Sequence, residues 1–498
     1  MKPFNSIARV LILLLFANQV SAIYAEKKIF VVSDIHVMDS SLLDSPDNAA
    51  WQEDLAKNKK MQDLSIPAFD ALVEIIIQEH PDLVLITGDL TKDGEIESHD
   101  YVVKKLTEIE ASDIPVYVIP GNHDRGWQED AKKYENNTWT ATKYMSESRF
   151  LSYYEPFGYG EGSEIHEGSL SYVTEPFPGL TLIGIDSGQE ALVKEETIKW
   201  LGSKLLQSKE KGNQVLVMTH HSVLSHFYGQ ESFQPYSVIQ DEEPDEEKEL
   251  SQLATVLLDG GAKVVLTGHY HVSDITRYQQ GEQELYDVCT GSTISYPCDY
   301  RILTFDDQFK TLNIVTKSIE DLSGYEDFPT YAKERLQASV YNWALRWLSE
   351  HVEDQTVNQL LAQLIANVFV IHAEGNEPEN PASAEAILLF EGITALSPIF
   401  DDLIAILVNQ VGLSIKSMLG DYPSEHDKDN VVNDRELTIT MPTSSPTTIK
   451  PLHQSSHSDD SWYTLQGVRL PAMPTKPGLY IQNGVLVPIN QAIDKNEH

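Results

Sequence analysis

Five short blocks of this sequence place aspartate, asparagine and histidine directly after apolar runs, where their side chains could bind metal ions. In chain order the blocks are Asp34-Ile35-His36, Gly88-Asp89, Gly121-Asn122-His123-Asp124, His220-His221 and Gly268-His269-Tyr270-His271. One such block is weak evidence, because a lone histidine at the end of a strand is often only a polar cap. Five in succession indicate a metal centre.

The residue types fit a centre of two divalent cations. Carboxylate, imidazole and amide groups suit Mn, Fe, Zn or Co. Two such cations about 3.5–4 Å apart can clamp the attacking and leaving oxygens of a phosphoryl transfer. Side chains at i and i+2 of a strand share one face. The spacing of His269 and His271 could therefore give one ligand to each metal.

The apolar runs that precede the blocks predict buried strands, and helix-period segments separate them. The runs are found in KIFVVSDIH, PDLVLITGD, IPVYVIPGNHD, NQVLVMTHH and AKVVLTGHYH, with a further strand in GLTLIGIDS. Strand and helix alternate as in a sheet with crossover helices, where functional groups lie at the ends of strands. We expect the five blocks to meet at one edge of such a sheet.

These blocks resemble the motifs of the calcineurin-like metallophosphoesterase superfamily, which read D-x-H, G-D, G-N-H-[DE], H and G-H-x-H. The resemblance covers roughly residues 28 to 317. It implies an α/β fold, a two-sheet sandwich of mixed sheets flanked by helices. It also implies a set of metal ligands. They are Asp34, His36 and His271 for one metal, Asn122, His220 and His269 for the other, and Asp89 as the bridge.

The resemblance gives His123 a different role, facing the phosphoryl group as general acid or charge stabiliser, with Asp124 orienting it. Two histidines follow the fourth strand. The family's ligand is normally the first, which favours His220; the alternative for His221 is a pocket or core histidine.

The implied activity is hydrolysis of a phosphoester by attack of metal-bound hydroxide on phosphorus. A small phosphodiester is the expected substrate. The alternatives are a phosphomonoesterase or nucleotidase of the same fold, and a cell-envelope binding protein that has lost the reaction. A protein of the last kind is expected to lack Asp89 or His123, and both residues are present, which favours an enzyme.

Composition limits the partners. The formal net charge of -40 repels polyanions, so nucleic acid is not an expected partner. Cys289 and Cys298 are the only cysteines, and they could pair or remain thiols. The sequence does not indicate an oligomeric state.

Residues 1–22 have the order of a secretory signal: Lys2 and Arg9, an apolar stretch at 10–16, and small residues at 20–22. The apolar stretch is too short to span a membrane, and no other stretch approaches that length. We expect a protein that is secreted, periplasmic or on the cell surface.

The remainder of the chain changes character. We expect a metallophosphoesterase domain at 27–317, a helical domain at 325–420, a linker with a short strand at 421–460, and a small β-hairpin unit at 461–490. The helical domain could be a lid over the strand ends or a scaffold, and the sequence leaves both open.

Overall fold

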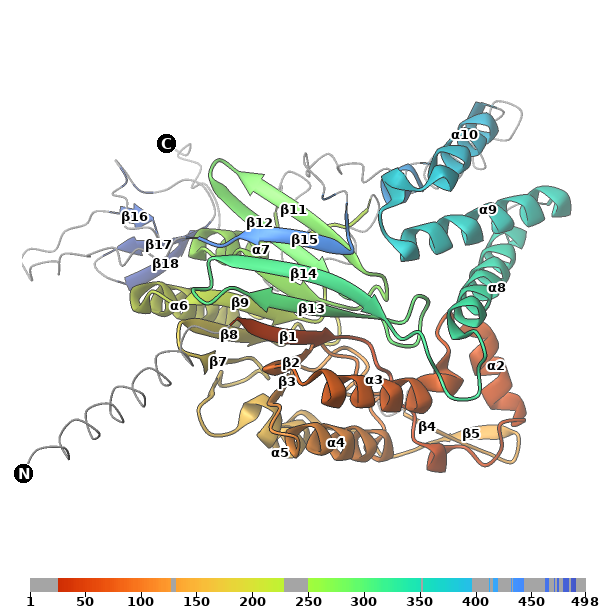
Figure 1. The fold of residues 1–498 in the computed structure, drawn as a ribbon, viewed down its shortest axis with the longest axis horizontal. Helices are drawn as coiled ribbons and strands as arrows, with labels where there is room; N and C mark the ends of the chain where they lie inside the picture. Colours follow the sequence, from red (N-terminus) through yellow and green to blue (C-terminus); the bar gives the residue numbers. More distant parts are fainter. Residues whose placement is uncertain are drawn as a thin grey trace, which may run out of the picture.

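Two mixed β-sheets form the centre of the molecule (Figure 1). The computed structural model describes residues 26–126, 131–227, 250–350, 353–395, 412, 415–419, 431, 433–442, 462–464, 470, 473, 478–482 and 485–489. The predicted signal segment lies outside these residues, as does most of the predicted linker. The two-sheet α/β architecture expected from the sequence is confirmed.

The first sheet has six strands in the order β15-β14-β13-β1-β2-β3. Their bounds are β1 (Lys27–Val32), β2 (Leu83–Ile86), β3 (Val116–Val118), β13 (Asp299–Phe305), β14 (Thr311–Ser318) and β15 (Glu436–Thr440). Strands β1, β2 and β3 are parallel, so their carboxyl ends lie at the same edge. Helices α3 (Ser65–Glu79) and α4 (Ile96–Glu110) connect them, and the apolar face of α3, which includes Phe69 and Leu72, is buried.

The second sheet has seven strands in the order β11-β12-β10-β9-β8-β7-β6. Their bounds are β6 (Glu164–Ile165), β7 (Tyr172–Phe177), β8 (Leu180–Ile185), β9 (Gln214–Thr219), β10 (Val264–Thr267), β11 (Asp274–Gln280) and β12 (Gln283–Cys289). Here β8, β9 and β10 are parallel. Helices α6 (Glu195–Lys211) and α7 (Gln252–Gly260) pack on this sheet.

Strand β9 contains the apolar run Val215–Met218 because both faces of the strand are buried. Leu216 and Met218 belong to the core between the two sheets, whereas Val215 and Val217 belong to the core under α6 and α7. Successive side chains of a strand point to opposite faces, so a strand covered on both faces is a continuous apolar run.

Smaller elements surround the two sheets. They are α2 (Ala49–Lys57), α5 (Glu147–Tyr153), the hairpin β4 (Lys132–Glu135) and β5 (Thr138–Ala141), and the short helical turns η1 (Ser40–Leu42), η2 (Gln62–Leu64) and η3 (Glu155–Tyr159). The C-terminal β unit is a three-stranded antiparallel sheet of β16 (Trp462–Thr464), β17 (Gly478–Gln482) and β18 (Val485–Ile489).

Three helices lie together at one end of the molecule, next to α2 (Figure 1). They are α8 (Phe328–Ser349), α9 (Gln355–Glu374) and α10 (Pro381–Ala395), and the turn η5 (Glu377–Glu379) joins the last two. Asp327 and Asp354 cap the N-termini of α8 and α9 with their carboxylates. These helices share a core of their own, which includes Val340, Ile365 and Phe390.

Helix α9 bears on the expectation that no stretch beyond the N-terminal segment approaches the length of a membrane span. Among the described helices it is the one long and apolar enough to cross a membrane, by length and composition alone. Most of its apolar window is buried inside the protein, as in a core helix. Cys289 and Cys298 are both buried and free, so the possible disulfide is not formed.

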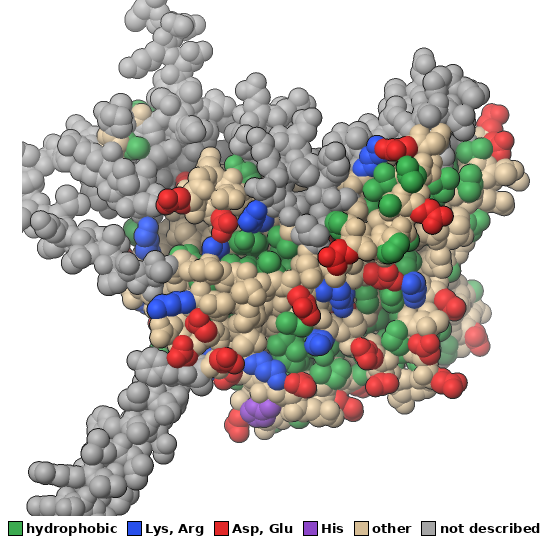
Figure 2. All heavy atoms as spheres, turned by 45° about the horizontal axis from the view of Figure 1, so that its top comes forward, with side chains coloured by type: hydrophobic (Ala, Val, Ile, Leu, Met, Phe, Trp, Pro, Cys, Tyr) green, Lys and Arg blue, Asp and Glu red, His purple; other side chains and the backbone are tan. Residues whose placement is uncertain are grey.

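Charged side chains are mixed on the face that Figure 2 shows. Aspartate and glutamate are spread over the described surface with lysine and arginine between them, and the basic side chains do not gather into a patch on this face.

Strand β15 returns to the first sheet from the segment predicted as a linker, and pairs antiparallel with β14. The fully buried side chain of Arg301 fixes this return. Its guanidinium donates to the carbonyl oxygens of Cys289 at 2.6 Å and Asp434 at 2.7 Å, and to Thr316 Oγ1 at 2.7 Å. One cation thus joins both sheets to the returning segment.

We expect Arg301→Leu to lower the free energy of unfolding by about 3 kcal/mol or more, because it leaves several buried carbonyl oxygens without donors. Urea unfolding measures the change. Lys317→Leu, on the exposed face of β14, is the control and should stay within about 0.5 kcal/mol of the wild type. Equal stability of the two variants would contradict the role given to Arg301.

Candidate metal centre

The structure brings the seven predicted ligands together in two adjoining groups. Among the described residues, Asp34, His36, Asp89 and His271 form one group, and Asp89, His220 and His269 form the other, with ligand atoms within 4.8 Å of one another in each. Asn122 joins the second group, since its Oδ1 lies 3.0 Å from both His220 Nε2 and His269 Nδ1. Asp89 belongs to both groups, which is the place predicted for a bridging ligand.

The ligands come from both sheets and not from one sheet edge, as the sequence had suggested. Asp34, Asp89 and Asn122 follow β1, β2 and β3 of the first sheet. His220 and His269 follow β9 and β10 of the second. The carboxyl ends of both parallel segments meet because the sheets pack face to face through one core.

The backbone at the ligands is left-handed, which the strand-pleat argument did not foresee. Strands β1 and β10 end before the ligands, and φ is 52° at Asp34, 42° at His36, 74° at His269 and 62° at His271. A left-handed conformation costs a non-glycine residue about 1–3 kcal/mol and is concentrated at functional sites. The backbone N–H groups of Asp34 and His36 donate to the carbonyls of Gly88 and Asp89 at 3.1 and 2.9 Å, which holds the conformation in place.

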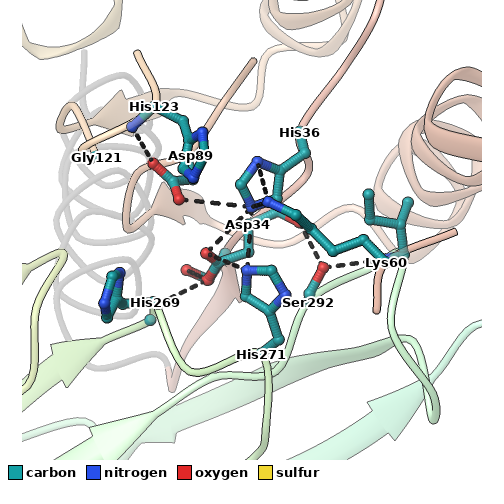
Figure 3. A network of polar contacts seen from close by, with 12 residues as sticks. Asp34, His36, Lys60, Asp89, Gly121, His123, His269, His271 and Ser292 are labelled. Carbon is teal, nitrogen blue, oxygen red and sulfur yellow. Dashed lines mark hydrogen bonds and ion pairs between the residues drawn. The ribbon is translucent and has the colours of Figure 1, made fainter. Parts of the chain in front are cut away.

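Each carboxylate has one oxygen held by the protein and one that faces imidazoles (Figure 3). Asp34 Oδ2 accepts from Ser33 Oγ at 2.6 Å and from the N–H of His269 at 2.9 Å. Its buried Oδ1 accepts no hydrogen bond and lies 3.2 Å from His271 Nε2. Asp89 Oδ1 accepts from the N–H of His123 at 2.8 Å, while Oδ2 lies 3.5 Å from His36 Nε2 and 3.2 Å from His220 Nε2.

The imidazoles present metal-binding nitrogens to these oxygens. His36 Nε2 and His271 Nε2 face each other at 3.1 Å, and His220 turns Nε2 inward because its Nδ1–H donates to the carbonyl of Thr87 at 2.8 Å. Burial lowers the pKa of His36 and of His269 to about 3, which keeps both in the neutral form that binds metals. The unpartnered Asp34 oxygen and the facing nitrogens fit two divalent cations.

The carboxylates carry the negative charge that such cations need. Burial alone would raise the pKa of Asp34 and Asp89, but the surrounding histidines hold both well below the usual range. Burial would also lower the pKa of His220, yet Asp89 raises it to about 9. Asp89 and His220 are therefore strongly attracted to each other across the second group.

His220, not His221, adjoins the bridging carboxylate. His221 is buried behind it, with Nδ1 2.8 Å from Ser187 Oγ and its ring 4.4 Å from that of His269. This buried position is the one expected under the alternative for His221, a pocket or core histidine.

His123 lies at the open side of the centre. Its ring centroid is 5.0 Å from that of His36, and 33% of its side chain is exposed. Its Nδ1 lies 2.9 Å from Asp93 Oδ1, and the other Asp93 oxygen contacts Lys92. Burial and Lys60 lower the pKa of His123, but Asp89 and Asp93 outweigh them and raise it, so the imidazolium is favoured.

The predicted orienting role of Asp124 is wrong in this structure. Its buried carboxylate accepts from the N–H groups of Gly121 and Thr91 at 2.8 and 2.9 Å, so it fixes the loop rather than the imidazole. Asp93 makes the contact instead. Its place four residues after Asp89 is the signal in the sequence that could have found it.

Other polar residues near the blocks have structural partners. His99 is buried, with its ring nitrogens 2.6 Å from Tyr154 Oη and 2.9 Å from the carbonyl oxygen of Asp124. The guanidinium of Arg125 lies 2.6 Å from Asp186 Oδ1. These contacts favour structural roles for both.

A third buried group joins the helical region to the loop that carries His269 and His271. His372 Nδ1 lies 2.6 Å from Glu377 Oε1, its Nε2 lies 3.9 Å from Asp274 Oδ2, and His226 Nδ1 lies 2.6 Å from Asp274 Oδ1. Buried ionic contacts are costly to break. They favour a fixed scaffold over a movable lid for this part of the helical region.

We expect Asp93→Asn to shift the alkaline limb of the pH–rate profile to lower pH by about one unit, and to reduce kcat. As a general acid, His123 would act only when protonated, so activity would be lost as pH rises through its pKa, and loss of the Asp93 carboxylate would lower that pKa. Asp100→Asn, at an exposed position of α4, is the control. A profile unchanged by Asp93→Asn would contradict the assigned contact.

Comparison with known proteins agrees with this geometry. A family model described as calcineurin-like phosphoesterase matches residues 27–273. A probable glycerophosphodiester phosphodiesterase of Arcobacter nitrofigilis is 31% identical over 149 residues, which are 29% of this chain and 43% of that protein. The match thus spans less than half of that relative.

Solved structures resemble the chain at low sequence identity. A dimetal phosphatase from Danio rerio has a TM-score of 0.41 at 14% identity, covering 59% of this chain and 96% of that one. A purple acid phosphatase from yellow lupin has a TM-score of 0.38 at 13% identity, covering 61% of this chain and 53% of that one. Through residues 27–273 this chain belongs to the calcineurin-like phosphoesterases, hydrolases of phosphoesters that depend on two divalent metal ions.

Proposed function

We propose that this protein hydrolyses a small phosphodiester. The observation that carries the proposal is the Asp89 carboxylate, whose Oδ2 lies within 3.5 Å of imidazoles from both ligand groups, with His123 beside it. The formal net charge of -40 weighs against a long polyanion, which supports a small substrate.

The predicted ligands form two sets, one for each cation, which share Asp89. Asp34, His36 and His271 would hold one cation, Asn122, His220 and His269 the other, and Asp89 both. Divalent cations at such a site polarise the phosphoryl oxygens and activate the attacking water. Asp93 holds the imidazolium of His123 in place. This imidazolium would give a proton to the leaving oxygen or stabilise its negative charge.

The diester preference has one further support. The relative from Arcobacter nitrofigilis bears the name of a phosphodiesterase, and the match to it is limited to 149 residues. The metal ligands themselves suit a monoester equally well, so the test must compare the two substrates.

We also propose that the protein is exported. The support is the order of charge, apolar stretch and small residues in positions 1–22.

The activity test compares bis-p-nitrophenyl phosphate with p-nitrophenyl phosphate, using protein loaded with Mn. We expect faster turnover of the diester, loss of metal and turnover in Asp89→Asn, and a fall in kcat of about 10²–10⁴-fold in His123→Ala. Removal of metal with a chelator should abolish turnover, and added Mn should restore it.

Asp47→Asn, an exposed carboxylate outside the centre, is the matched control and should behave as the wild type. Faster turnover of the monoester would replace the diesterase by a phosphomonoesterase. No turnover of either ester by fully metal-loaded protein would favour a binding protein.

Export is tested by expressing the full chain with its N-terminus intact and sequencing the N-terminus of protein recovered outside the cytoplasm. We expect cleavage after residue 22, or a few residues later. An uncleaved chain that stays in the cytoplasm would count against export.

A further inference from the structure

Lys60, which lies outside the five motif blocks, reaches the metal centre from the segment between α2 and η2 (Figure 3). Its Nζ lies 3.3 Å from His36 Nδ1 and 3.2 Å from His36 Nε2. The ammonium group therefore lies against the imidazole ring of His36, a predicted metal ligand.

The main chain beside Lys60 is attached to the loops of the centre. The N–H of Met61 donates to the carbonyl of Ile294 at 2.7 Å, and Gln62 Nε2 donates to the carbonyl of His36 at 2.5 Å. The N–H of Lys60 itself donates to Asn58 Oδ1 at 3.1 Å. Lys60 is thus held at the centre by its backbone, unlike a surface lysine whose position is set by solvent.

The charge of Lys60 has no contacting counter-charge in the described part of the chain. Both polar contacts of its Nζ there are to His36, and the carboxylates of Asp34, Asp89 and Asp93 act on it from a greater distance. An anion bound next to the ammonium would complete its coordination.

A phosphoryl group is the anion that the site chemistry supplies. An ammonium group has three donors and no acceptor, so a protonated lysine cannot ligate a metal but can donate to a phosphoryl oxygen. Lysine acts as a compact point charge on phosphates. Negative charge grows on the phosphoryl oxygens during the transfer, and a donor fixed in advance stabilises it.

We propose that Lys60 binds a non-bridging oxygen of the substrate's phosphoryl group. This inference rests on the proposed phosphoesterase function. It adds to that function a phosphate-binding residue from outside the five motif blocks.

Lys59 provides a matched control next to it. Its Nζ lies over the ring of Trp343 at 4.4 Å and near that of Phe369 at 5.3 Å, so it contacts the helical region and not the centre. Lys59→Met and Lys60→Met remove the same charge at adjacent positions.

The experiment titrates orthophosphate into Mn-loaded protein by calorimetry, and measures bound metal in the same samples. We expect Lys60→Met to weaken orthophosphate binding about tenfold or more. Lys60→Arg should retain most of the affinity, Lys59→Met all of it, and the metal content should be the same in every variant. With the diester, Lys60→Met should lower kcat/KM by a similar factor.

Unchanged orthophosphate affinity in metal-loaded Lys60→Met overturns the proposal, as does loss of metal from that variant, which would make Lys60 a positioning residue for His36. If Lys60→Met does not fold, Lys60→Gln decides by the same two measurements. Phosphate binding that depends on Lys60 without any ester hydrolysis would reject the proposed function alone. Hydrolysis that does not depend on Lys60 would reject this inference alone.

Discussion

The structure depends on the attraction between two buried carboxylates and the imidazoles gathered around them. Asp89 is the critical member, because its free oxygen lies between His36 from one sheet and His220 from the other. Placing these groups together away from water is unfavourable unless their charges are compensated, and bound cations supply that compensation. The two sheets must therefore pack in a single relative position, which the continuous apolar core between them provides.

The loops that carry the ligands are packed closely against one another, which restricts where the ligand side chains can lie. A Cβ on Gly268 would lie 1.9 Å from Ser33 Oγ, the same hydroxyl that holds Asp34. Gly268 thus allows the loop from the second sheet to touch the loop from the first. With the left-handed backbone at the ligands, such close contacts fix the positions of the ligand side chains. Preorganisation of this kind is what an electrostatic catalytic site requires.

Sequence patterns could predict the ligands and the strands that precede them, because each motif lies within a few residues and each strand has a local apolar signature. They could not predict contacts that join distant segments. The family resemblance pointed to Asp124 as the partner of His123, and only the folded loop shows that backbone N–H groups already occupy Asp124 and that Asp93 contacts the imidazole. The approach of Lys60 to His36 likewise depends on how the segment after α2 folds back. The left-handed backbone at the ligands was not predicted, because two residues spaced i, i+2 fit an extended strand as well as a left-handed turn.

Strand β15 has a consequence for the order in which the chain can fold. Its neighbour β14 ends at Ser318, and the whole helical region is formed by the residues that separate the two strands. The helices are thus an excursion between adjacent strands of one sheet. A nascent chain that has completed α9 still presents β14 as an open edge, which is a site for unwanted pairing with other chains. Such a distant pairing closes slowly, so β15 protects this edge only after the whole helical region has been synthesised.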